Sequence, residues 1–161
     1  MLTNALPMLR VSDVTRQFQA QGRTVRALAG VSLSVPRGST FSLVGESGCG
    51  KTTLARIVAG LDRASSGSVA FTADAAARKP RVQMVFQDPY ASLNPRWRIG
   101  RTIAEPLLFQ RLRPAEQAPA RVAELLQRVG LSAADAQKYP HEFSGGQRQR
   151  ISIARALAGE P

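Results

Sequence analysis

The sequence predicts an α/β fold in which a β-rich first half precedes a mainly helical second half. Three observations lead to this prediction. Apolar and polar residues alternate in two segments near the N-terminus, which is the period of a half-buried strand. A glycine-rich loop then joins a short apolar run to a helix. Beyond residue 87 apolar residues recur at helical spacing, so we expect the strands and the helices to be segregated along the chain.

Size and composition agree with one folded domain. The chain has 161 residues, of which 43% are hydrophobic and 20% charged, close to the averages of globular proteins. No apolar run approaches the roughly 18 residues of a membrane span, and the first residues do not resemble an export signal. The lone Cys49 cannot form an internal disulfide. These features predict a protein of the reducing cytosol.

Five strands are expected in the first half. Two alternating segments suit a pair of antiparallel strands, a more apolar run suits a buried central strand, and two further runs follow it. In chain order these segments are Leu9–Val14, Val31–Val35, Thr40–Val44, Gly67–Phe71 and Val82–Phe86. The segment Asp74–Lys79 is expected to be a loop. Helices are expected over Ile99–Leu108, Ala118–Val129 and Gly146–Leu157.

The strongest local motif follows the expected central strand. It fits G-x-x-x-x-G-K-[ST] and consists of Gly45, Glu46, Ser47, Gly48, Cys49, Gly50, Lys51 and Thr52. Glycines let successive backbone N–H groups turn inward, and the start of the following helix adds partial positive charge. Lys51 can then reach β- and γ-phosphate oxygens, and the Thr52 hydroxyl can bind Mg²⁺. Thr53 is expected to support the helix.

A second motif stands at the start of the last expected helix. Ser144, Gly145, Gly146 and Gln147 follow Phe143 and open an Arg- and Ala-rich helix. The helix start offers a second anion site. Ser144 followed by two glycines also fits an N-cap with a flexible turn, and the residues alone leave both interpretations open.

Net charge permits several classes of partner. The chain carries 22 Lys and Arg residues against 11 Asp and Glu, a formal charge of +11. Such an excess attracts nucleotides, nucleic acid or acidic lipids. The arginines are scattered rather than grouped, so they also fit an ordinary solvated surface.

Together these motifs resemble the nucleotide-binding subunit of ATP-binding cassette (ABC) transporters, whose LSGGQ signature is FSGGQ here. The resemblance covers essentially the whole chain. The segments GESGCGKTTLARIVAGL, QDPYASLNPRWRIGRTIAEPL and YPHEFSGGQRQRISIARAL are similar to the peptide and nickel importer group. The implied fold is a P-loop NTPase core with an antiparallel β subdomain and a helical subdomain. It implies a β subdomain and core at 1–86, a Gln loop and helical subdomain at 87–143, and a signature helix at 144–161.

The resemblance also implies roles, cofactors and partners. Phe18 would stack on adenine, and Gln87 would join Lys51 at the γ-phosphate and Thr52 at Mg²⁺. Two such domains would meet head to tail, so that the signature of one contacts the ATP held by the other. Membrane permease subunits would be the further partners, at the cytoplasmic face of the membrane, and no nucleic acid is expected.

The family pattern continues beyond the signature helix with an Mg²⁺-site Asp and a catalytic Glu, whereas this chain ends at Gly159-Glu160-Pro161. We therefore expect a cassette that is incomplete at its C-terminus and inactive alone. Two other classes remain open. A P-loop ATPase acting on nucleic acid would use the positive charge directly, and a small nucleotide or metabolite kinase would leave FSGGQ unexplained.

Three aromatic or apolar side chains and one histidine lie outside the two motifs. Tyr90, Leu93 and Trp97 fit a patch that receives a permease helix, or they pack internally. His141 precedes the signature, whereas the family's catalytic histidine follows it, so we expect a surface or structural role for His141.

Overall fold

The computed structural model describes residues 7–20, 22–72, 81–88 and 92–161. The chain forms two compact units, Met1–Val82 and Gln83–Pro161, and each is described by itself. The finer division at residues 86 and 143 stays a prediction. The loop expected over 74–79 lies outside the described residues.

The first unit contains an antiparallel sheet. Its strands are β1 (Leu9–Ala20), β2 (Arg23–Val35) and β3 (Ser66–Phe71), in the order β2-β1-β3. β1 pairs with both neighbours, so Leu9 lies opposite Val35 on one side and Phe71 on the other. The alternating segments thus form the antiparallel pair that the sequence predicts, and the hairpin is longer than expected.

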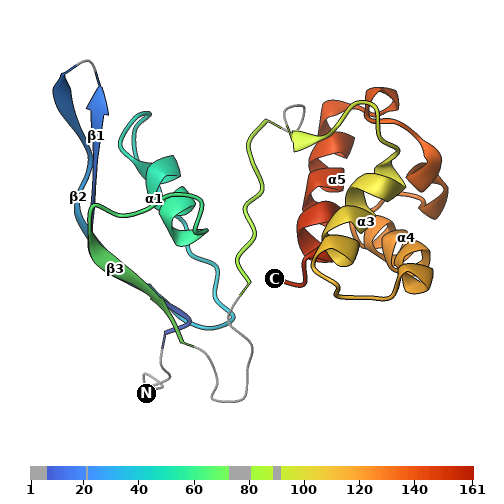
Figure 1. The fold of residues 1–161 in the computed structure, drawn as a ribbon, viewed down its shortest axis with the longest axis horizontal. Coiled ribbons are helices and arrows are strands. Elements are labelled where there is room, and N and C mark those ends of the chain that lie inside the picture. Colours follow the sequence, from blue (N-terminus) through green and yellow to red (C-terminus); the bar gives the residue numbers. More distant parts are fainter. Residues whose placement is uncertain (1–6, 21, 73–80, 89–91) are drawn as a thin grey trace. The chain divides into compact units, whose positions relative to one another are not determined.

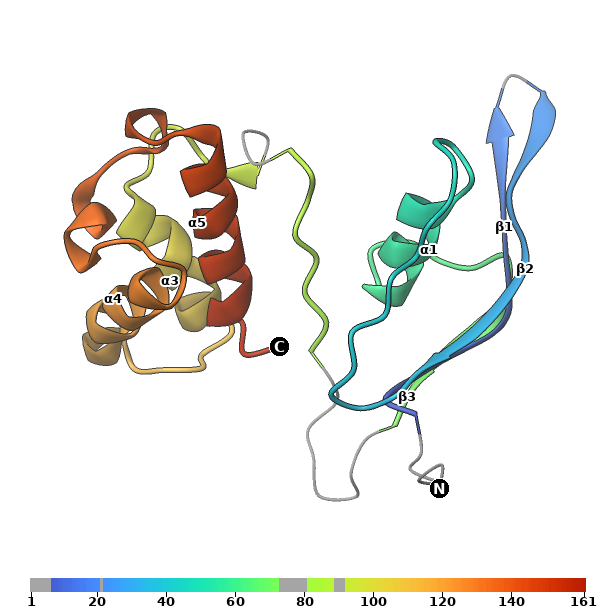
Figure 2. The same ribbon diagram turned by 180° about the vertical axis from the view of Figure 1, so that it is seen from behind.

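Helix α1 (Lys51–Val58) packs on this sheet. Leu54 and Ile57 are three residues apart, so they share the helix face that meets the sheet. The buried cluster joins the two elements and consists of Val11, Val14, Leu28, Leu54 and Ile57. Figures 1 and 2 show α1 lying along one face of the β1–β2 hairpin from opposite sides.

The second unit is helical. Its helices are α3 (Ile99–Phe109), α4 (Ala118–Arg128) and α5 (Gly145–Ala158), joined by short 3₁₀ turns at Ala115–Gln117, Ala133–Gln137 and Pro140–Glu142. All three expected helices are confirmed. Their apolar faces form one core of Leu93, Ile99, Ile103, Leu107, Val122, Leu125, Leu126, Leu131, Phe143, Ile151, Ala154 and Ala158. No helix in the described part of the chain is both long and apolar enough to cross a membrane.

Two expected strands are wrong. Residues 40–44 and 82–86 carry neither strand nor helix. Backbone groups of a strand need a hydrogen-bonded neighbour, and the sheet of the described residues contains only β1, β2 and β3. The apolar side chains of these segments therefore stay open to solvent, with Val44 90% and Phe41 49% exposed. Apolar character alone does not make a strand without a partner.

Candidate functional site

The glycine-rich loop ends in a helix start with unused backbone donors. Gly50 is the N-cap of α1 and has a φ of 92°, and Gly48 has a φ of 83°. Both angles are left-handed, which glycine adopts without steric cost. The Leu54 N–H donates to the Gly50 carbonyl at 2.9 Å, so the helix ladder begins there. The amides of residues 51–53 precede that ladder and are available to an anion.

Close packing against β2 fixes the position of Gly50. A Cβ at this residue would lie 2.5 Å from the Ala27 carbonyl oxygen and 2.8 Å from Leu28 Cδ2. Real Cβ atoms do not approach so closely, so the site accepts only glycine. The loop is therefore anchored to the hairpin backbone at the point where α1 begins.

The Lys51 side chain folds back over the loop. Its Nζ donates to the carbonyl oxygens of Gly45 at 2.8 Å and Glu46 at 2.5 Å, and lies 3.5 Å from Cys49 Sγ. Thr52 is exposed and Thr53 half-buried at the helix start. The structure thus brings the predicted loop residues together, with one ammonium group above them.

Phe18 lies on β1, in the hairpin whose other strand Gly50 approaches. It pairs across the strands with Val25, and the two side chains are 38% and 52% exposed. Val25 is two residues from Ala27, the residue that Gly50 contacts, which corresponds to about 7 Å along a strand. The partly exposed ring therefore lies on the hairpin that Gly50 approaches.

Arg16 and Asp62 complete the surroundings of Phe18, and neither belongs to a sequence motif. The Arg16 guanidinium carbon lies 4.4 Å from the centroid of the Phe18 ring. The same guanidinium pairs with an Asp62 carboxylate oxygen at 2.8 Å. Residues 46 positions apart meet here, so only the pairing of β1 with neighbouring elements could have revealed the contact.

The signature motif caps α5. The Gln147 N–H donates to Ser144 Oγ at 3.3 Å, and the Ser144 N–H donates to Gln147 Oε1 at 2.9 Å. This reciprocal arrangement is a capping box. The N-cap interpretation of Ser144 is therefore correct. The anion-site interpretation stays a prediction, since a capped helix still presents positive potential at its start.

Two further residues hold the entrance to α5. Phe143 is only 4% exposed and belongs to the helical core. Arg148 Nε donates to the Pro140 carbonyl at 2.8 Å and ties the first turn of α5 to the segment before it. Among the described residues, nothing lies within 4 Å of a Cβ added at Gly145 or Gly146. The helix start is thus rigidly held and sterically open.

A charged pair precedes the signature. Lys138 Nζ donates to Asp135 Oδ1 at 2.7 Å, and the Ser132 N–H donates to Asp135 Oδ2 at 2.9 Å. The hydrogen bond from Lys138 chiefly lowers the pKa of Asp135, with support from the Ser132 amide. The same bond raises the pKa of Lys138, whose ammonium also lies 5.7 Å from the Phe143 ring centroid. The pair stabilises the turn that leads to the signature.

The remaining predicted residues lie elsewhere in the second unit. Gln87 is exposed in a segment without helix or strand. Leu93 is 5% exposed in the helical core, which favours internal packing for this residue. Trp97 is half-buried, with the Arg101 guanidinium 4.0 Å from its ring centroid. Tyr90 lies outside the described residues, so the proposed patch stays a prediction.

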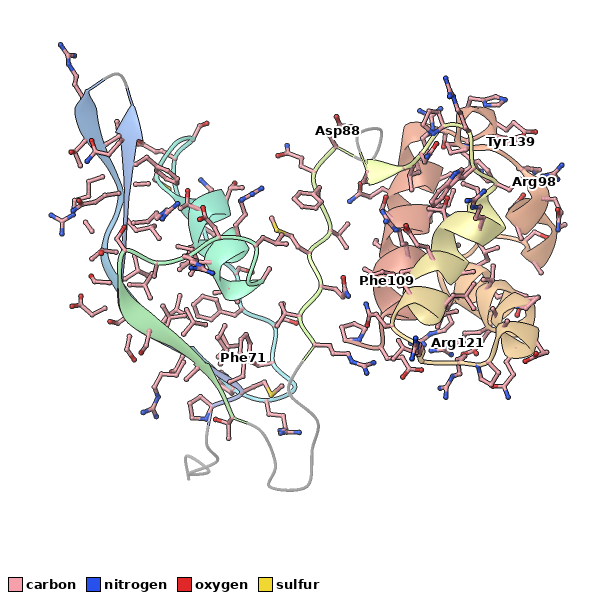
Figure 3. The ribbon with its side chains drawn as sticks, in the orientation of Figure 1. Phe71, Asp88, Arg98, Phe109, Arg121 and Tyr139 are labelled. Carbon is pink, nitrogen blue, oxygen red and sulfur yellow. The ribbon has the colours of Figure 1, made fainter. Side chains whose placement is uncertain are left out.

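His141 is exposed and takes part in an aromatic stack. Its ring lies 5.7 Å from that of Tyr139, with 9° between the planes. The Arg98 guanidinium carbon lies 5.3 Å from the centroid of the Tyr139 ring, so Arg98 and Tyr139 form one surface group (Figure 3). This arrangement agrees with the expected surface role of His141.

The predicted residues therefore form two groups. The phosphate loop and Phe18 belong to the first unit, and Gln87 and the signature belong to the second. Among the residues that the structure describes, no cluster of three or more His, Cys, Asp or Glu side chains could hold a metal. A metal at the loop would depend on the Thr52 hydroxyl and on oxygens of a bound nucleotide.

Comparison with known proteins identifies the family. The ABC transporter family model matches residues 28–161. A di/tripeptide transport ATP-binding protein of Pseudomonas aeruginosa is 44% identical, covering 96% of this chain and 52% of the relative. A dipeptide transport ATP-binding protein of Haemophilus influenzae is 40% identical, covering 99% of this chain and 52% of the relative. The chain spans about half the length of the curated relatives it matches.

Solved structures agree with the sequence relatives. The dimeric structure of a bacterial ABC transporter cassette has a TM-score of 0.81 and 31% identity, covering 96% of this chain and 71% of that one. A post-hydrolysis dimer of the same cassette, bound to ADP and phosphate, has a TM-score of 0.79 and 28% identity, with the same coverage. The P-loop core, antiparallel β and helical parts expected from the motifs are thus those of a known ATPase fold, and this chain belongs to the ABC transporter family.

Proposed function

We propose that this chain binds ATP at residues 45–53 as the ATP-binding part of a transporter that imports peptides or similar solutes. The observation that carries the proposal is the closed loop at the start of α1. The amides of residues 51–53 precede the helix ladder, and the Lys51 ammonium lies on the same loop, because its Nζ donates to the Gly45 and Glu46 carbonyls. A triphosphate supplies the anionic oxygens that such a site favours.

Mg²⁺ fits this site as a partner of the nucleotide. It prefers oxygen ligands and is commonly held by a few protein groups together with substrate phosphates and water. The Thr52 hydroxyl, exposed beside Lys51, is the protein oxygen that would hold it, with Gln87 as the second candidate ligand. When bound, the ion would neutralise charge that develops on the phosphates.

The signature would serve a second copy of the chain or a related cassette. In the part of the chain that the structure describes, no neighbour would exclude a Cβ at Gly145 or Gly146, and neither has a positive φ. Glycine in a helix costs roughly 1 kcal/mol relative to alanine. Packing among the described residues therefore requires neither glycine, and close approach of an external phosphate would account for both. Dimeric structural relatives support this arrangement.

The membrane partners and the solute follow from the relatives. Two of them are named for dipeptide or di/tripeptide transport. Permease subunits would receive this chain at the cytoplasmic face of the membrane, and a pull-down that identifies them would identify the class of solute.

Calorimetric titration with MgATP tests the central part of the proposal. Lys51→Ala should weaken ATP binding by roughly 1.5–3 kcal/mol, the contribution of a charge-assisted hydrogen bond. Lys138→Ala is the matched control, because it removes the same charge at a residue that binds Asp135 instead of the loop. Equal ATP affinity of the parent and Lys51→Ala would refute the assignment.

Cys49 provides an independent readout of the same site. It is exposed, and its Sγ lies 3.5 Å from Lys51 Nζ. Since it is the lone cysteine of the chain, a thiol reagent reports on this loop alone. Saturating MgATP should slow the labelling, and an unchanged labelling rate would contradict nucleotide binding at the loop.

A further inference from the structure

We propose that Arg16 is a positioning residue that holds the Phe18 ring in place for a nucleobase, and that Asp62 holds Arg16. The inference rests on the proposed function, in which Phe18 receives the base of ATP. It extends that function to two residues that no motif indicated. The two contacts that carry it are the cation–π contact of Arg16 with Phe18 and the ion pair of Arg16 with Asp62.

The Phe18 ring is not fixed by burial. It is 38% exposed, and Val25 opposite it is 52% exposed. The buried cluster of this unit includes neither residue. An exposed aromatic side chain samples several rotamers, and each one that points away from the ligand weakens stacking. A contact that restrains the ring therefore contributes directly to base binding.

Arg16 is placed to supply this restraint. Residues 16 and 18 of a strand point to the same face, so the guanidinium can lie over the ring. The observed distance from Arg16 Cζ to the ring centroid is 4.4 Å, well within the range of a cation–π contact. One face of the ring thus carries the guanidinium, and a base would stack on the ring from the other side.

Asp62 fixes the guanidinium in turn. Its carboxylate oxygen lies 2.8 Å from an Arg16 nitrogen, and the two side chains are only 20% and 22% exposed. The backbone at Asp62 is held as well, because the N–H groups of Leu61 and Asp62 donate to the Arg56 carbonyl at 2.8 and 3.3 Å. The pair is therefore a defined contact rather than a mobile surface bridge.

Helix α1 consequently connects the two ends of the nucleotide site. Lys51 at its first position belongs to the proposed phosphate site, and Asp62, four residues beyond its last residue Val58, holds Arg16 and through it Phe18. Movement of the helix relative to the hairpin would change both ends together. Arg16 therefore determines how much the base adds to the binding of the triphosphate.

The ratio of two affinities measures that contribution. Calorimetric titration with MgATP and with magnesium tripolyphosphate gives, for each variant, the factor by which the base strengthens binding. Arg16→Ala should reduce this factor about three- to tenfold while leaving the tripolyphosphate affinity unchanged. Arg16→Lys keeps a cation for both contacts and should restore most of the loss. Arg10→Ala, an exposed arginine on the same strand, is the matched control.

The outcomes separate this inference from the proposed function. No binding of tripolyphosphate by the parent chain would refute the phosphate site itself. If Phe18→Ala reduced the ratio of MgATP affinity to tripolyphosphate affinity and Arg16→Ala did not, Phe18 would still bind the base. The proposed role of Arg16 would then be wrong. An equal loss of both affinities in Arg16→Ala would also overturn it, because it would show general damage to the unit.

Discussion

In the helical unit twelve buried residues form one core, whereas in the first unit five do so. The first unit also leaves large apolar side chains exposed next to its loop, with Leu43 at 44% and Val44 at 90%. A helix satisfies its backbone within one segment, and a strand needs a partner from elsewhere in the chain. The helical segments therefore complete their own core, while the segments around the phosphate loop depend on distant partners.

The two functional motifs are held in correspondingly different ways. The phosphate loop is positioned by the close approach of Gly50 to β2 and by the Lys51 hydrogen bonds to the Gly45 and Glu46 carbonyls. The signature is positioned by the capping box of Ser144, the buried Phe143 and the Arg148 bond to Pro140. We therefore expect substitutions at the signature to act through the helical core, and substitutions at the loop to act locally.

The largest expected effect is at Phe143. Phe143→Ala should destabilise the helical unit by about 3–5 kcal/mol, because it empties space in a packed core. Phe143→Leu, which restores the usual residue of the family signature, keeps most of the apolar contact and should cost much less. Hydrogen exchange resolved by peptide provides the measurement. Loss of protection in α3–α5 with unchanged protection in β1–β3 is expected, and equal loss in both units would contradict their independence.

Gly50→Ala should have the next largest effect and act on the other unit. A left-handed alanine costs about 1–2 kcal/mol, and the overlap with Ala27 and Leu28 adds about 1–3 kcal/mol. Gly48→Ala is the matched control, since its φ is 83° but nothing lies within 4 Å of the new Cβ. Denaturant unfolding and MgATP titration should both show the larger loss for Gly50→Ala. Equal losses would mean that backbone conformation alone, and not contact with the hairpin, positions the loop.

A smaller effect is expected from the Asp135–Lys138 pair before the signature. The lowered pKa of Asp135 means that its stabilising contribution is complete above the unfolded pKa of about 3.9 and is lost as pH falls through the lower folded value. Asp135→Asn should therefore cost about 0.5–2 kcal/mol at neutral pH, the usual range for a capping side chain. Urea unfolding between pH 2 and pH 7 should show the parent and variant converging in acid.

Glu124→Gln provides the control for that experiment. The pKa of Glu124 is also lowered, chiefly by its hydrogen bond to Arg121, but the carboxylate side chain is 52% exposed. Water and salt screen such a pair, so the substitution should change stability little. If Glu124→Gln changed the pH dependence of stability relative to the parent as much as Asp135→Asn does, burial of the turn would not matter.

The contrast between helices, which satisfy their own backbone, and strands, which need a distant partner, also explains how much could be predicted from the sequence. The phosphate loop, the signature and the three helices were predictable because each is encoded within a short segment by spacing, glycine and capping chemistry. The strands expected at 40–44 and 82–86 were wrong because apolar content does not specify a pairing partner. Arg16 and Asp62 were missed for the same reason, since their contact depends on how β1 lies against the segment after α1.

The smallest expected change in stability is at Gly146, and it tests why the signature contains glycine. Gly146 has ordinary helical backbone and open space around an added Cβ. Gly146→Ala should leave the helical unit as stable as before or stabilise it by up to about 1 kcal/mol. Gly130→Ala in the same unit is the control, because its φ of 72° makes any side chain strained.

Nucleotide-dependent self-association of Gly146→Ala should decrease, although the stability of its helical unit is kept or increased. If the helix start receives a nucleotide held by a second cassette, the methyl group of Gly146→Ala would obstruct that approach, and nucleotide-dependent self-association measured by sedimentation should fall. A variant that is more stable yet associates less would show that the glycine serves an external ligand. A Gly146→Ala chain as unstable as Gly130→Ala would instead reveal a structural requirement within α5, and the assignment of the signature to a partner's nucleotide would lose its physical basis.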